Sequence, residues 1–70
     1  MKIIFTLHSE IQLEERGILK QDVIDSIKYP DRIIKKYNKY YYQKRLEMGE
    51  IEIVCERTEK HIKVITVYWL

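Results

Sequence analysis

Residues 27–36, with the sequence IKYPDRIIKK, contain the point at which the chain changes from a helical to an extended pattern. Pro30 cannot continue a helix, and it pushes Tyr29 towards an extended conformation. Before Pro30 the apolar residues recur at helical spacing, whereas after it β-branched and aromatic residues alternate with polar ones. The sequence therefore predicts helices on the N-terminal side of Pro30 and strands on its C-terminal side.

Two helices are predicted in the N-terminal half. The first covers about residues 9–16, because Ser9 and Gln12 fit a capping box at its start. Gly17 follows it and suits the left-handed conformation that ends many helices. The second helix covers about residues 20–28, where apolar residues again have helical spacing.

Four strands, separated by short polar turns, are predicted in the C-terminal half. They cover residues 32–36, 40–46, 51–57 and 61–69, and residues 2–6 supply a further strand beside them. Short turns join antiparallel neighbours. We therefore expect a single α+β domain over residues 1–70 in the order β-α-α-β-β-β-β. Its two helices should pack on one face of a four- to five-stranded antiparallel sheet.

Alternation along the strands predicts which residues face the helices. They are Tyr42, Leu46, Ile51, Ile53, Cys55, Ile62, Val64, Thr66 and Tyr68. Lys44 is expected on the same side, where a lysine needs a carboxylate partner or an exit to solvent. Ile65, Val67 and Trp69 would then form an apolar stripe on the opposite face. Such a stripe suggests a partner surface, for example in a homodimer.

Composition limits the classes of function. The 70 residues are 46% hydrophobic and 34% charged, as in a globular domain. No apolar run approaches the roughly 20 residues of a membrane helix, and residues 1–6 are too short an apolar segment for a signal peptide. Cys55 is the single cysteine, which agrees with a reducing compartment. We therefore expect a cytoplasmic protein with no membrane partner, no metal and no cofactor.

Basic residues are concentrated between Asp31 and Glu47, although the whole chain has 13 basic and 11 acidic residues. Every charged residue in this interval is basic, namely Arg32, Lys35, Lys36, Lys39, Lys44 and Arg45, and four tyrosines are interleaved with them. Cations neutralise phosphates, and tyrosine rings stack on exposed bases. The same composition also suits a solvated edge strand that its lysines protect from aggregation. RNA binding and edge protection are therefore both open at this point.

A set of single residues is spread over almost the whole chain. In order they are His8, Arg16-Gly17-Ile18, Asp22-Val23, Ile27, Pro30, the Lys/Tyr-bearing strand and residues 64–68, VITVY. This order resembles a family of short uncharacterised prokaryotic domains that looks like an offshoot of the RelE/BrnT-like toxins. The resemblance implies a RelE-like fold. RelE-type toxins are small basic ribonucleases that need no metal and pair with an antitoxin.

The resemblance also implies a function. His8, Arg16, Lys44 and Thr66 match positions that family members usually fill with these residues. It therefore implies a toxin-like, metal-independent endoribonuclease of a toxin–antitoxin pair. Its partners would be RNA, free or associated with the ribosome, and a cognate antitoxin. Family members often have arginine where this chain has Gln12, which removes one cation from the expected phosphate site.

Metal-free RNA cleavage requires proton transfer from the 2′-hydroxyl and to the leaving 5′-oxygen, together with positive charge near the phosphorane. In this hypothesis His8 transfers protons, while Arg16 and Lys44 stabilise charge, so these three are the expected catalytic residues. The expected RNA-binding residues are Lys36, Tyr42, Arg45, Thr66 and Tyr68.

A non-catalytic module of the same fold that binds RNA or a protein is the alternative function. The missing cation at Gln12 favours it. Each candidate also has a structural explanation, since His8 suits a capping or packing role beside a helix start. Arg16 complements the dipole of its helix, and Thr66 is an ordinary strand residue. The sequence leaves the catalytic and the binding functions open.

Overall fold

The computed structural model describes all of residues 1–70. The strands are β1 (Lys2–Phe5), β2 (Arg32–Lys36), β3 (Lys39–Leu46), β4 (Gly49–Arg57) and β5 (His61–Trp69), and the helices are α1 (Leu7–Arg16) and α2 (Lys20–Lys28). The predicted order β-α-α-β-β-β-β is confirmed, and so are the bounds of α2, β2 and β5. Neither helix has the length and apolar character that crossing a membrane requires.

The five strands form one mixed sheet in the order β1-β5-β4-β3-β2. Strands β2 to β5 are antiparallel neighbours, whereas β1 pairs with β5 in parallel, with Lys2 opposite His61 and Phe5 opposite Val64. The prediction of a purely antiparallel sheet is therefore wrong for one pairing. No short turn sets the direction of β1, because two helices and three strands separate it from β5 along the chain.

Helix α1 begins at Leu7, earlier than predicted. Thr6 is its N-cap, and the Thr6 side chain accepts a hydrogen bond of 3.1 Å from the Ser9 backbone N–H. Ser9 and Gln12 are buried inside the helix, so the predicted capping box is wrong. Gly17 ends the helix in the left-handed conformation with φ 64°, as predicted.

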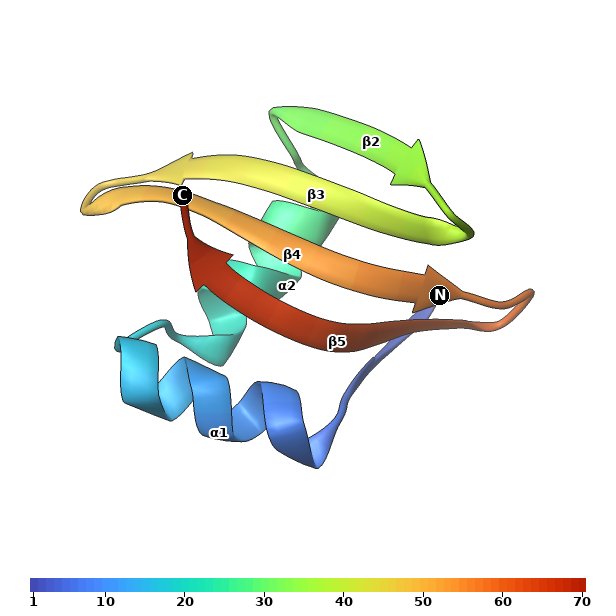
Figure 1. The fold of residues 1–70 in the computed structure, drawn as a ribbon, viewed down its shortest axis with the longest axis horizontal. Coiled ribbons are helices and arrows are strands. Elements are labelled where there is room, and N and C mark those ends of the chain that lie inside the picture. The colour runs from blue at the N-terminus through green and yellow to red at the C-terminus, as the bar shows by residue number, and fades with distance from the viewer.

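The hydrophobic core lies on one face of the sheet. Its buried residues are Leu13, Ile18, Val23, Ile27, Tyr42, Ile51, Ile53, Cys55, Ile62, Val64 and Val67. In Figure 1, α2 lies behind the sheet and α1 runs along the outer edge of β5. The face towards the viewer is covered by neither helix, and we call it the open face.

A β-bulge interrupts the alternation of β5. Cys55 of β4 lies opposite Val64, but Val54 lies opposite Thr66, so Ile65 is an extra residue on β5. An extra residue shifts every following side chain to the other face of the sheet. The face of residues 66–69 is therefore the reverse of the one that strict alternation predicts.

Two predictions from strict alternation are wrong because of the bulge. Val67 is fully buried in the core, and Trp69 packs against that core. Thr66 and Tyr68 do not face α2, because they share the open face with the side chains of Val54 and Glu52 opposite them. The apolar stripe that suggested a homodimer is therefore not present on the open face.

The open face is described by the register of the four antiparallel strands. Its residues are Arg32, Ile34 and Lys36 on β2, Lys39, Tyr41, Gln43 and Arg45 on β3, Glu50, Glu52, Val54 and Glu56 on β4, and Lys63, Thr66 and Tyr68 on β5. The β2 and β3 residues include four cations, whereas β4 supplies three glutamates. The charge of this face therefore changes sign from the β2–β3 hairpin to the middle of the sheet.

Candidate functional site

Side chains of α1 close the part of the β5 edge that β1 does not reach. Gln12 Oε1 accepts hydrogen bonds from the Val67 backbone N–H at 3.0 Å and from Thr66 Oγ1 at 2.6 Å. Arg16 Nη1 donates to the Val67 carbonyl oxygen at 2.6 Å. Both backbone groups of Val67 thus have a side-chain partner, so this part of the edge is closed to a further strand. We call this arrangement the α1–β5 latch.

His8 is exposed and lies one helical turn before Gln12. Its Nε2 is 2.9 Å from Gln12 Nε2. Gln12 Oε1 accepts hydrogen bonds from Val67 and Thr66, so the amide oxygen of Gln12 is the atom that faces β5. The amide nitrogen of Gln12 is therefore the donor to His8, and His8 Nε2 is the acceptor. A neutral imidazole that accepts at Nε2 carries its hydrogen on Nδ1. The lone pair that a general base would use is therefore already occupied.

Lys44 lies outside this group. Its Nζ is 3.3 Å from Asp31 Oδ1, so it has the carboxylate partner that its position on the helix-facing side requires. The hydrogen bond from the Arg45 backbone, together with Lys44, holds the pKa of Asp31 below its ordinary value. Strand β4 separates Lys44 on β3 from the latch at β5. The structure thus brings His8, Arg16 and Thr66 together, and it leaves Lys44 apart.

The residues expected to bind RNA lie in different environments. Tyr42 is 2% exposed in the core, where burial raises its pKa, so its ring is not accessible to a base. Lys36 and Arg45 are exposed on the β2–β3 hairpin. Thr66 belongs to the latch, and Tyr68 lies on the open face.

Most cations of the β2–β3 hairpin are free of carboxylate partners. Among the basic residues between Asp31 and Glu47, Lys44 forms an ion pair, whereas Arg32, Lys35, Lys36, Lys39 and Arg45 form none. Lys36 Nζ lies 5.3 Å from the centroid of the Tyr37 ring. Figure 1 shows this hairpin at the edge of the sheet that lies away from α1.

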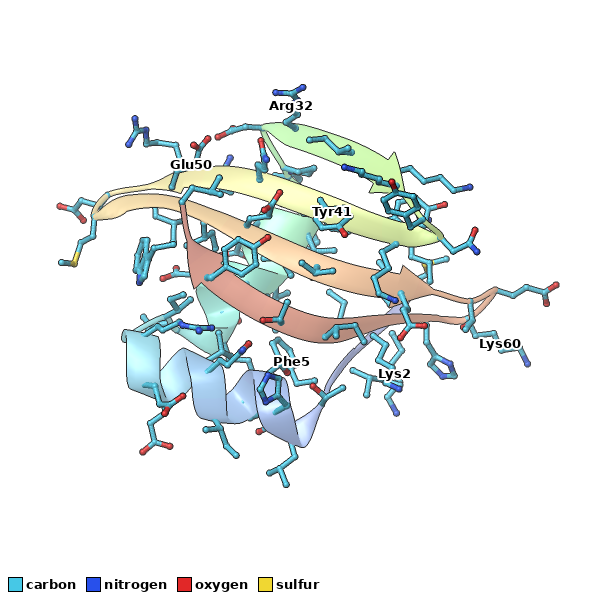
Figure 2. All side chains as sticks on the ribbon, in the orientation of Figure 1. Lys2, Phe5, Arg32, Tyr41, Glu50 and Lys60 are labelled. Atoms are coloured by element: carbon cyan, nitrogen blue, oxygen red, sulfur yellow. The ribbon has the colours of Figure 1, made fainter.

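A hollow of about 280 Å³ lies beside the hairpin on the open face. Its lining residues are Ile34, Lys36, Tyr37, Tyr41 and Glu52. Figure 2 shows Tyr41 in front of β3 on this face. The sequence pattern marked Lys36 and the tyrosines as a group. That pattern did not group Glu52 with them, and Glu52 reaches the hollow because β4 pairs with β3.

Glu52 is held in place by two neighbours. Gln43 Nε2 donates to Glu52 Oε1 at 3.0 Å, and the Tyr68 hydroxyl donates to Glu52 Oε2. Burial, and then the hydrogen bond to Glu52, raises the pKa of Tyr68 to about 12, so this hydroxyl stays a donor at neutral pH. A carboxylate has about four lone-pair sites, so each Glu52 oxygen can accept a further hydrogen bond.

Comparison with known proteins identifies the family. Searches of the curated proteins and of the solved structures found no match. The model of a family described as Domain of unknown function (DUF4258) matches residues 5–69. This range includes both helices, the latch and the β2–β3 hairpin. The chain therefore belongs to the DUF4258 family of domains of unknown function.

Proposed function

We propose that this domain binds single-stranded RNA through the β2–β3 hairpin and the adjoining part of the open face. The observation that carries the proposal is the set of five hairpin cations without an ion pair. Such cations are available to phosphates, and their binding releases counterions from the RNA. Tyr37 and Tyr41 lie among them and offer ring faces for bases.

The exposed tyrosine rings and the charges on the open face favour the binding of single-stranded RNA over that of a duplex. Aromatic rings stack on bases that are splayed out of a helix, and paired bases do not offer their faces. Glu50, Glu52 and Glu56 make the middle of the open face acidic. We therefore expect the phosphates to follow the hairpin and only the bases to reach towards β4.

Fluorescence anisotropy with a labelled single-stranded RNA tests this proposal. Lys36→Ala and Lys39→Ala are each expected to weaken binding, because each removes a cation from the hairpin. Lys28→Ala is the matched control, since Lys28 is exposed at the end of α2, behind the sheet. Equal affinities of Lys36→Ala and Lys28→Ala, or no binding at low salt, would contradict the proposal.

The toxin-like, metal-independent endoribonuclease is the second candidate function. The grouping of His8, Arg16 and Thr66 at the latch favours it, because these residues match the positions implied by the resemblance to RelE-like toxins. In this candidate a cognate antitoxin and RNA, free or ribosome-associated, are the cytoplasmic partners. It ranks second because the His8 Nε2 lone pair is occupied and Lys44 lies apart.

Cleavage assays in EDTA test the second candidate. Losing a general acid or base costs about 10²–10⁴-fold in rate, so His8→Ala should remove most of any cleavage. His61→Ala is the control, because His61 is the other histidine and begins β5 away from the latch. If the purified protein cuts neither naked RNA nor RNA on translating ribosomes, this candidate is rejected and RNA binding without catalysis stands.

A further inference from the structure

The turn between β2 and β3 holds a tyrosine in an unfavourable backbone conformation. Lys36 pairs with Lys39, so Tyr37 and Asn38 form a two-residue turn, with φ values of 52° and 62°. Positive φ at both positions is typical of a type I′ turn, which favours glycine, asparagine and aspartate. A bulky residue with positive φ is an outlier, and such outliers concentrate at functional sites.

Packing does not explain why tyrosine occupies this position. Tyr37 is 83% exposed, so its ring gains little from the core. Its ring instead lines the hollow on the open face, together with Tyr41 and Lys36. An exposed ring held at a strained position beside a hollow is placed to contact a ligand in that hollow.

The chemistry of the hollow describes that ligand. Tyr37, Tyr41 and Ile34 suit a flat, largely apolar ring, and Lys36 suits an adjacent anion. The hollow, at about 280 Å³, is smaller than the roughly 300–1,000 Å³ of sites for drug-sized ligands. Glu52 offers two oxygens that only accept hydrogen bonds, so it selects a ring with N–H donors and would repel a phosphate.

We propose that this hollow binds one guanine base, with its ring against the tyrosines, its Watson–Crick edge on Glu52 and its phosphate near Lys36. The inference rests on the proposed RNA binding and names the base that the hairpin selects. The base belongs either to a single-stranded RNA or to a free guanine nucleotide. Both sources present the same ring and the same phosphate.

Hydrogen-bond donors distinguish guanine from the other three bases. Guanine carries two adjacent donors on its Watson–Crick edge, at N1 and at the 2-amino group, and these match the two oxygens of a carboxylate. Adenine and cytosine each place a ring acceptor beside a single amino group, and uracil has one donor between two carbonyl oxygens. Gln43 and Tyr68 hold the Glu52 carboxylate and leave one site on each oxygen for the base.

Titrations with GMP, AMP, CMP and UMP, followed by amide chemical shifts, test the selectivity. Parallel titrations use single-stranded RNAs that differ at one base. GMP and the guanine-containing RNA should bind most tightly, whereas a preference among mononucleotides alone would identify the free nucleotide as the source. RNA binding with no preference for guanine among either the RNAs or the mononucleotides overturns the inference and leaves the proposed function intact. Failure of every RNA to bind rejects the proposed function itself.

Two variants that each remove one negative charge distinguish binding in the hollow from the effect of overall charge. Glu52→Gln should lower the preference for guanine about tenfold, because a bidentate contact contributes discrimination of this order. Glu56→Gln is the matched control, since Glu56 lies on the same strand and face but does not line the hollow. An unchanged preference in Glu52→Gln overturns the assignment.

Tyr37→Asn tests the role of the Tyr37 ring in a variant that should fold at least as stably as the wild type. Asparagine tolerates positive φ better than tyrosine, so this variant should unfold at a higher temperature. It should also lose about tenfold in affinity for GMP, because stacking on one ring is of this order. A more stable variant that still binds GMP as tightly as the wild type would overturn the role of the ring.

Discussion

At the scale of single residues, Gln12 has the most consequences for the molecule. Its buried side chain accepts from Val67 and Thr66 and donates to His8. The backbone N–H of Val67 is buried and has Gln12 Oε1 as its acceptor. A buried N–H without an acceptor loses its hydration without compensation, which makes this hydrogen bond important for stability.

We expect Gln12→Ala to lower the free energy of unfolding by about 1–3 kcal/mol, the usual cost of leaving a buried donor unsatisfied. Urea denaturation measures this difference. His8→Ala is the control, because it removes an exposed ring whose protein hydrogen bond is the one to Gln12, and it should change stability by about 0.5 kcal/mol or less. If Gln12→Ala is as stable as the wild type, the latch does not hold α1 to the sheet.

At the scale of elements, the latch replaces a neighbouring strand. The first half of β5 pairs with β1, whereas Val67 in the second half is bonded by side chains of α1. An amide at an open sheet edge normally exchanges its hydrogen quickly, because water reaches it. The Val67 amide is covered, so it should behave as an interior amide.

We therefore predict slow hydrogen exchange at the Val67 amide in the wild type and fast exchange in Gln12→Ala. NMR-detected exchange in D₂O measures both rates. The amides of Ile53 and Cys55 in β4 are the internal control, since these residues are buried in the core on the central strand of the sheet. Fast exchange at Val67 in the wild type would show that the latch opens readily.

Elements were predictable wherever local chemistry sets them. Pro30 and Gly17 end the helices by their own backbone preferences, and the β2–β3 hairpin follows from strand residues on both sides of a short turn. The parallel pairing of β1 and the bulge at Ile65 depend on contacts across the sheet, which periodicity does not contain.

The candidate sites divide in the same way. The hairpin cations are adjacent in sequence, so composition was sufficient to find them. The latch joins residues that are 54 and 55 positions apart, whereas the sequence indicated Gln12 as a capping-box residue and as the position of a missing cation. Tyr41 and Tyr42 lie side by side in the same basic stretch, so composition does not distinguish them. Alternation along β3 buries Tyr42 in the core and places Tyr41 at the hollow.

At the scale of the whole molecule, the free energy of unfolding should fall as the pH rises in the alkaline range. Burial raises the pKa of Cys55 from 9.0 to about 12, and burial together with Glu52 raises that of Tyr68 from 10.0 to about 12. The folded protein therefore holds these two protons more tightly than the unfolded chain does. The resulting stabilisation is complete below pH 9 and is lost as the pH rises towards 12.

Urea denaturation between pH 8 and pH 12 measures this dependence, and the free energy of unfolding should fall across the window. Tyr68→Phe should have a shallower fall between about pH 10 and pH 12, because phenylalanine has no proton to lose. A constant free energy of unfolding up to pH 12 would contradict the pKa directions given for these groups.

The distribution of charge over the molecule leads to the central claim, which is RNA binding by the hairpin. Its five unpaired cations lie on one edge of the sheet, while β4 presents glutamates on the open face. If phosphates bind these cations, affinity must fall as salt rises, because counterions compete for the RNA. The net charge of the whole chain is nearly balanced, so it would not produce this salt dependence by itself if the hairpin cations served only to protect the sheet edge from aggregation.

The dependence of RNA affinity on salt concentration tests this claim most directly. For single strands the slope of log K against log salt is about −0.7 for each phosphate neutralised, so the wild type should have a clear negative slope. Lys36→Ala should make that slope shallower by about 0.7, and Lys28→Ala should leave it unchanged. An affinity that does not vary with salt, or equal slopes for the two variants, would contradict the account.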